Sequence, residues 1–403
     1  MPARLLLLAL LATAALAQSS SSVFEQVGEM IATLSEITGW PVHKTVPSQM
    51  LGKHSFRRFV EARMKEISSD KETRAEELTL KMFGLVPQDF NLARETVDLV
   101  SEQAAAFYDY NKKRLYILDT TSAGTEQRVA LVHELAHALA DQHHPLGKYL
   151  RHGSPDDDAA TAREAVMEGQ ATWLTWAYVS KRNGGKAEVP PAMLERLTSG
   201  VDAASPEYPI FSNAPLYLRE SLVFPYDEGM RFQNAVYRKL GRQSFDQVFT
   251  HPPVSTQQII HPEAYLAGKK PSEPDPPPLP HAIVKSFRIL AEGSVGEFDH
   301  SVLLRQYVGE KEGSAAASHW HGGTFRLYEH KQEKYPVLAY TSEWDTPESA
   351  RVYFTLYQRV LKGKWKKMDV AARSDGEISG RGDSGHFELR LSGATVHSIE
   401  GLR

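Results

Sequence analysis

The chain has 403 residues, of which 41% are hydrophobic and 24% are charged, as in ordinary globular proteins of two or three domains. Its formal net charge of −4 indicates neither nucleic acid nor an anionic membrane as a partner. It has no cysteine, which excludes disulfides, thiol nucleophiles and thiolate metal sites, so any metal must be held by histidine and carboxylate side chains.

The N-terminus has the pattern of a secretory signal peptide over residues 1–17. Arg4 precedes an apolar run from 5 to 16, and Ala15-Leu16-Ala17 is a small-x-small cleavage pattern. The run is shorter than a membrane span, and no other stretch approaches that length. We therefore expect export to the periplasm or the extracellular space, cleavage near Ala17, and no membrane segment in the mature protein. An uncleaved N-terminal anchor is the alternative.

The next part of the chain has mostly helical patterns around one hairpin. Residues 23–90 show helical periodicity, and the sequence leaves open whether they form a removable pro-segment. Between 104 and 118, aromatic and β-branched stretches flank a polar turn at 111–113, which predicts a β-hairpin. Two helices are expected after it, from about 125 to 142 and from about 159 to 182.

A proline-rich stretch divides the chain. Residues 271–280 (PSEPDPPPLP) predict a stiff, extended linker. After it, strand-like alternation is mixed with helical patterns, including a helix that begins at Thr346-Pro347-Glu348. We therefore expect an α+β fold. A mostly helical domain over 23–270 with a small edge β-sheet precedes a smaller α+β accessory domain over 281–403.

The chemistry is indicated by His133-Glu134-Leu135-Ala136-His137 on the first of the two expected helices. Residues four apart lie on one helical face, so His133 and His137 present two imidazoles to one point, at a separation that suits zinc. Glu134 stands beside that point and can take a proton from a metal-activated water. The helix is apolar and so expected to be buried, where two histidines need partners or a metal. Two satisfied core histidines are the alternative interpretation.

Zinc also needs a third protein ligand. Position 140 is Ala where the three-histidine pattern HExxHxxGxxH has Gly, so we exclude that class and expect a carboxylate from the second helix. Glu164 and Glu168 lie one turn apart on it and can face the same way. One of them can bind the metal while the other orients a ligand histidine.

Residues 133–141 (HELAHALAD) resemble the active-site helix of thermolysin-like peptidases, and the pairing with a downstream glutamate helix is that of the gluzincin clan. The resemblance covers roughly residues 104–180 and extends more loosely to secreted bacterial proteins of this type. It implies a zincin-like catalytic domain, an edge strand from the 104–118 hairpin, one zinc ion, and hydrolysis of peptide bonds.

The resemblance also bears on the third ligand. Thermolysin-like members, which have an acid four residues after the ligand, indicate Glu164, whereas members with the ligand directly before a glycine indicate Glu168-Gly169. We favour Glu168, because a glycine there lets the helix pack closely against its neighbour. Glu164 is then a supporting residue or the alternative ligand. Asp141 becomes a candidate that supports the site from one turn beyond His137, with a solvated charge at a helix end as the alternative.

Such a peptidase also needs a donor for the developing oxyanion, and Tyr226 and His261 are the candidates. We expect an exported, monomeric zinc peptidase that acts on peptides or proteins with Glu134 as general base. The alternatives are a zinc amidase acting on a non-peptide or cell-wall amide, and a non-catalytic binding protein on a peptidase scaffold. His319-Trp320-His321 has no third ligand nearby in sequence, so no second metal site is expected there.

Overall fold

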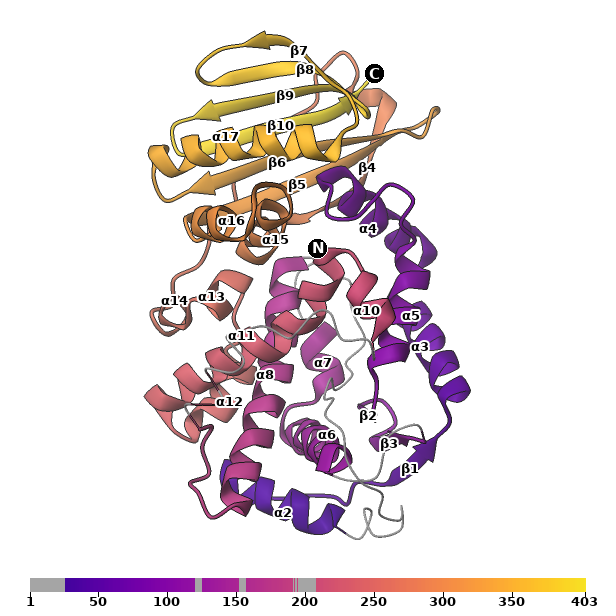
Figure 1. The fold of residues 1–403 in the computed structure, drawn as a ribbon, viewed down its shortest axis with the longest axis vertical. Coiled ribbons are helices and arrows are strands. Elements are labelled where there is room, and N and C mark those ends of the chain that lie inside the picture. The colour runs from indigo at the N-terminus through magenta and orange to yellow at the C-terminus, as the bar shows by residue number, and fades with distance from the viewer. Residues whose placement is uncertain (1–25, 120–124, 152–156, 191, 193, 195–207) are drawn as a thin grey trace.

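The computed structural model describes residues 26–119, 125–151, 157–190, 192, 194 and 208–403. They form an α+β fold in two regions, as expected: a mostly helical N-terminal region with a three-stranded sheet, and a C-terminal region built on a seven-stranded sheet (Figure 1). The predicted signal peptide lies outside the described residues. Within the described part of the chain, no helix is both long and apolar enough to cross a membrane.

The N-terminal region contains short strands and helices of very different lengths. Its elements are α2 (Val27–Thr38), β1 (Ser48–Leu51), α3 (Lys53–Ile67), α4 (Asp70–Phe83), α5 (Leu92–Gln103), β2 (Ala106–Asp109), β3 (Arg114–Leu118), α6 (Thr125–His143), α7 (Leu146–Arg151), α8 (Asp157–Arg182), α10 (Pro209–Asn213), α11 (Leu216–Leu240), α12 (Gln243–Thr250), α13 (Thr256–Ile260) and α14 (Pro262–Leu266). The predicted hairpin and both predicted helices are confirmed as β2–β3, α6 and α8.

The small sheet positions the hairpin between two helices. β2 pairs antiparallel with β3, and β1 pairs parallel with β3, so β2 is an edge strand. The ring of Phe107 stacks on Phe59 of α3 at 4.5 Å between centroids. The next residue, Tyr108, is bonded to α6 instead. Because neighbouring side chains of a strand point to opposite faces, one face of the hairpin packs on α3 and the other faces α6.

α8 and α11 are in direct backbone contact. A Cβ placed on Gly169 would lie 2.0 Å from the carbonyl carbon of Gly229, and a Cβ on Gly229 would lie 2.1 Å from the Ala165 oxygen. The two helices can therefore cross this closely only because both positions are glycine. The role expected of Gly169 is confirmed, and Gly229 is its partner. α11 also continues through Pro225 as one helix.

The C-terminal region is a sheet in the strand order β4-β5-β6-β10-β9-β8-β7. Its elements are η1 (Val284–Ser286), β4 (Phe287–Ser294), α15 (Glu297–Val308), α16 (Glu310–Ala317), β5 (Trp320–His330), β6 (Pro336–Trp344), α17 (Pro347–Lys364), β7 (Met368–Arg373), β8 (Glu377–Gly382), β9 (Gly385–Ser392) and β10 (Thr395–Leu402). α15, α16 and α17 lie on one face of this sheet (Figure 1). The helix predicted from Thr346 is confirmed as α17, with the Thr346 side chain accepting from the Ser349 N–H.

The predicted linker 271–280 is extended but does not stand free of the sheet. The Ser272 N–H donates to the His321 carbonyl at 3.0 Å, and the Thr341 hydroxyl donates to the Asp275 carbonyl at 3.0 Å. Leu279 is buried in a cluster with residues of β4, β5 and β6. This stretch therefore packs along the sheet and belongs to the C-terminal region.

α4 joins the two regions. The Phe83 ring packs edge-on against Phe325 and Tyr340, at 5.8 and 5.3 Å between centroids. Arg74 forms an ion pair with the buried carboxylate of Glu329 at 2.6 Å. The sequence left open whether residues 23–90 form a removable pro-segment. At the N-terminal end of this segment, α2 packs core side chains against α6. Residues 26–90 are thus part of the core of both regions.

Candidate metal centre

Three buried side chains from two helices converge on one point. His133 and His137 come from α6 and Glu168 comes from α8, and each is at most 5% exposed. Glu168 Oε2 lies 2.9 Å from His133 Nε2 and 3.3 Å from His137 Nε2, and the two ring nitrogens are 3.0 Å apart. Over the described residues, this is the group of histidine and acidic side chains whose ligand atoms gather within 4.8 Å.

The spacing of these atoms fits a metal ion. Ligand atoms about 2.0–2.1 Å from a tetrahedral zinc ion lie about 3.3 Å from one another, close to the separations seen between these side chains. Two imidazole nitrogens that face each other in a dry site share at most a proton, whereas a cation between them satisfies both and the carboxylate. Two imidazoles and one carboxylate suit zinc among the divalent metals.

The electrostatics favour the protonation states that ligands need. Burial raises the pKa of Glu168, but the two histidines outweigh burial and hold this pKa at about 2, so the carboxylate is ionised. Burial lowers the pKa of His133, which keeps that ring neutral. Burial also acts to lower the pKa of His137, but the Glu168 carboxylate outweighs it and the net shift is upward. A bound cation would displace that proton.

Glu134 is held by the edge strand. Its carboxylate is buried, and Oε2 accepts a hydrogen bond of 2.6 Å from the backbone N–H of Tyr108 on β2. The carboxylate therefore lies between the α6 backbone and the hairpin, beside the three converging groups. Sequence analysis did not single out Tyr108, although the period-two alternation of the hairpin places it on the face opposite Phe107.

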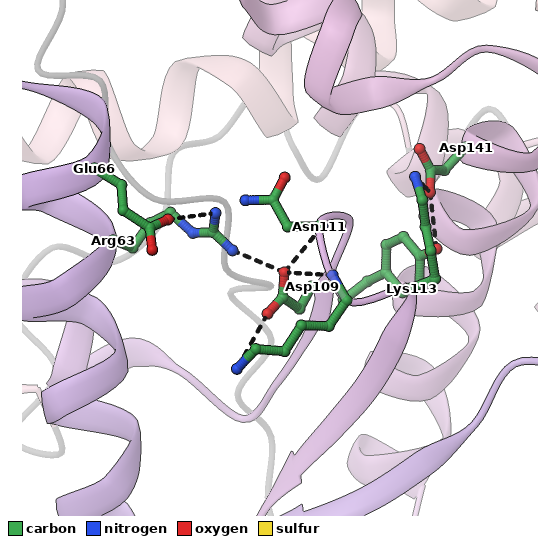
Figure 2. A network of polar contacts seen from close by, with 8 residues as sticks. Arg63, Glu66, Asp109, Asn111, Lys113 and Asp141 are labelled. Atoms are coloured by element: carbon green, nitrogen blue, oxygen red, sulfur yellow. Dashed lines mark hydrogen bonds and ion pairs between the residues drawn. The ribbon is translucent and has the colours of Figure 1, made fainter.

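Asp141 links the hairpin to α6. Its carboxylate accepts hydrogen bonds from the Tyr108 hydroxyl at 2.8 Å, from Lys113 Nζ at 2.6 Å and from the Leu146 N–H at 2.9 Å. Figure 2 shows the Lys113–Asp141 contact beside the group around Asp109. The resemblance implied that Asp141 supports the site. Its contacts hold the hairpin against α6, and the hairpin in turn holds Glu134 through the Tyr108 N–H. Tyr108 and Lys113 were missed because their partners are distant in sequence.

A second polar group fixes the other face of the hairpin. Asp109 Oδ1 accepts from Arg63 of α3 at 2.7 Å and from the Asn111 N–H at 3.0 Å, and Arg63 also pairs with Glu66 at 3.0 Å (Figure 2). The Asp109 side chain is fully buried. The hairpin is thus anchored to α3 on one face and to α6 on the other.

Tyr226, one of the two candidate oxyanion donors, lies beside the three converging side chains. The Tyr226 ring stacks on His133 with 5.8 Å between centroids. Burial, with the charges of Glu168 and Glu134 and a hydrogen bond to Glu168, raises the pKa of Tyr226 well above its usual range, so its hydroxyl stays protonated.

The other two candidates lie outside the converging group. His261 contacts Glu297 of α15 at 2.9 Å and Glu263 at 3.7 Å, at the junction with the C-terminal region, so we withdraw it as an oxyanion donor. Glu164 is half-buried, and its charge contributes to the raised pKa of Tyr226. The structure thus brings Glu168, and not Glu164, to the two histidines.

Comparison with known proteins bears on the C-terminal region alone. Residues 287–403 match the model of a family described as a domain of unknown function (DUF8575). No curated protein and no solved structure gives a match. The matched residues span β4 to β10 and contain none of the side chains of the candidate metal centre.

Proposed function

We propose that the protein is an exported zinc peptidase in which His133, His137 and Glu168 hold the metal. The observation that carries this proposal is the convergence of these three buried ligand atoms, with Glu134 beside them. Four polar side chains placed so close in a dry site are costly unless a cation and a reaction make use of them.

The side chains divide the work of hydrolysis among them. A zinc ion, when bound, supplies a Lewis acid that makes water nucleophilic near neutral pH. Glu134 takes the proton of the attacking water and passes it to the leaving amine, and the Tyr108 N–H keeps its carboxylate in place. Tyr226, protonated and stacked on His133, donates a hydrogen bond to the developing oxyanion.

The edge strand supports a peptide as the substrate. β2 ends the small sheet, and its neighbour on the far side of the hairpin is α6, which carries Glu134. An extended chain that adds to this edge through main-chain hydrogen bonds would present its peptide bonds to the site. Because β2 is buried and its Tyr108 N–H is bound to Glu134, such a chain would have to displace the groups that cover the edge. The signal pattern over residues 1–17 supports action outside the cytoplasm on peptides or proteins.

The test compares zinc content and cleavage of a mixed peptide library for the mature protein and two variants. We expect one zinc ion at the centre formed by His133, His137 and Glu168 in each. Glu134→Gln should keep its zinc and lose about 10²–10⁴ in turnover, because the general base is gone. Tyr226→Phe should keep its zinc and lose about 10²-fold, while Tyr237→Phe on the same helix serves as a control that leaves turnover unchanged.

Other outcomes separate the alternatives. Cleavage of cell-wall crosslinks without cleavage of peptides would indicate the amidase, and zinc binding without any hydrolysis would indicate a binding protein. Wild-type protein that holds no metal at this centre would overturn the proposal.

A further inference from the structure

Two histidines and one aspartate meet on the surface of the C-terminal region. His319 Nδ1 lies 3.4 Å from Asp345 Oδ2, and His321 Nδ1 lies 3.9 Å from Asp345 Oδ1. All three side chains are about half exposed, whereas Trp320 between the histidines is buried. Asp345 follows β6, so the fold supplies the third group that is missing from the sequence around His319.

The backbone holds these residues in place. The Asp345 N–H donates to the His319 carbonyl at 2.9 Å, and the His321 carbonyl accepts from the Ser272 N–H at 3.0 Å. The pairing of β5 with β6 shifts between Trp320 and Gly322, which makes His321 the extra residue of a bulge. Such bulges redirect a side chain and often lie beside functional sites.

The orientation of both rings is that of metal-binding histidines. Each ring turns Nδ1 toward the shared carboxylate, His319 within hydrogen-bonding distance at 3.4 Å and His321 beyond it at 3.9 Å. A proton held on Nδ1 leaves Nε2 as a lone-pair donor. Metal-ligating histidines commonly direct their second nitrogen to a carboxylate in this way. Among the described residues, Asp345 is the acidic group within ion-pair distance of both rings, and the two histidine side chains are 55% and 48% exposed.

The surroundings favour a cation. The Glu297 side chain is buried, with Oε1 at 2.9 Å from His261 and Oε2 without a hydrogen-bond partner in the described structure. Burial raises the pKa of Glu297, and the charge of Asp345 adds to this, so the two carboxylates are neighbours. Negative charge near two imidazoles stabilises a bound cation.

We propose that His319 and His321, oriented by Asp345, form a second metal site that binds a divalent transition metal ion such as Zn²⁺, Ni²⁺ or Cu²⁺. Imidazole ligands suit these ions, and the remaining coordination positions are open to water or to a ligand from outside the chain. The site lies in the region from β4 to β10, on residues that take no part in the centre on α6. This proposal does not depend on the proposed peptidase function.

The test counts metal on the mature full-length protein after dialysis against zinc. We expect a zinc ion at this site in addition to any at His133, His137 and Glu168. His319→Ala and His321→Ala should each lower the affinity for the additional ion at least about tenfold. Asp345→Asn should lower this affinity about 10–100-fold. His386→Ala, an exposed histidine on β9, is the matched control and should leave the count unchanged.

A parallel series in a His133→Ala/His137→Ala background keeps the two metal proposals apart, because it removes the pair of imidazoles on α6. There the additional ion should remain and should still depend on His319 and His321. Titration with Cu²⁺ in the same background should show two nitrogen ligands in the electron paramagnetic resonance spectrum, and one in each single variant. The proposal is overturned if the His133→Ala/His137→Ala protein binds no metal, or if substitution of neither His319 nor His321 affects the metal that it binds.

Discussion

Both regions of this molecule bury histidines, but the partners of the ring nitrogens differ between the two regions. In the C-terminal region, His300 of α15 is fully buried, with Nδ1 at 2.8 Å from the Gly296 carbonyl and Nε2 against the Tyr340 hydroxyl, which in turn lies 2.9 Å from the Tyr353 hydroxyl. In the N-terminal region, His133 and His137 turn their nitrogens toward each other. Burial alone is therefore no sign of a metal site, whereas converging lone pairs are.

The charges follow the same division. Burial lowers the pKa of His300 to about 4, so this ring is neutral and takes part in a closed chain of hydrogen bonds. Nearby, the buried carboxylate of Glu400 is matched by Lys364 at 2.6 Å and by the Tyr357 hydroxyl at 2.7 Å. The C-terminal network thus supplies its own partners, whereas we propose that the N-terminal cluster is completed by a cation.

The comparison is tested most directly by removing one histidine from the N-terminal cluster. His137→Ala takes away one of three ligands, and we expect zinc affinity to fall about a thousandfold or more, which corresponds to about 4 kcal/mol. The measurement is a competition titration with a chromophoric chelator. Unchanged zinc affinity in this variant would show that the three atoms do not bind the metal.

The matching change in the other region should leave zinc untouched. His300→Ala breaks a closed hydrogen-bond network and opens a cavity, so we expect the free energy of unfolding to fall by about 3 kcal/mol. Denaturant unfolding of the zinc-loaded protein measures this loss, and the chelator titration serves as the control. A large loss of zinc affinity here would erase the distinction between the two histidine environments.

The crossing of α8 and α11 links packing to the position of Tyr226. Gly229→Ala forces a methyl group against the Ala165 carbonyl, so we expect a loss of about 2–3 kcal/mol in unfolding free energy and a fall in turnover as α11 moves. The control is Gly28→Ala in α2, where an added Cβ meets nothing within 4 Å and should slightly stabilise the helix. Equal effects of the two substitutions would contradict the close crossing.

His300 also predicts how stability changes with pH. Its folded pKa of about 4 lies below the value of about 6.5 for a free imidazole, so the unfolded chain binds more protons between these values. Stability from this group is complete above pH 6.5 and falls as the pH drops toward 4, by about 2 kcal/mol between pH 7 and pH 5. Urea unfolding at these two pH values should show a smaller difference for His300→Asn than for the wild type.

The smallest effect is expected at the link between the hairpin and α6. Asp141→Asn weakens the contacts with Tyr108 and Lys113, and because Lys113 is half exposed we expect a stability loss of about 1 kcal/mol. Zinc content should stay, while turnover should drop because the Tyr108 N–H no longer holds Glu134 as firmly. If kcat and its pH profile match those of the wild type, Asp141 has no positioning role.

Much of the candidate site could be predicted, because its pattern is local. The spacing of His133 and His137 on one helix indicates a shared point in space, and the glycine after Glu168 indicates close packing of α8. Tyr226 could be identified only as one of two candidates, because the crossing at Gly229 depends on a contact between distant helices. Tyr108 and Asp345 could not be predicted as partners, since each meets its group through tertiary packing.

The fold shows the same limit. The α+β class, the hairpin, and helices such as α6, α8 and α17 follow from periodicity and capping signals. β1 was missed because it is a four-residue strand, and α15 was missed beside the strong strand patterns around it. α11 runs through Pro225 as one helix, because tertiary packing overrides the local helix-breaking effect of proline.

The position of β10 affects the order in which the molecule can be built. This strand is the last of the chain, yet it lies in the middle of the large sheet, between β6 and β9. Until it is in place, β6 and β9 on its two sides cannot be joined in one sheet. In a chain that emerges N-terminus first, the large sheet therefore cannot be completed until β10 has emerged. Folding of the large sheet thus becomes a late event.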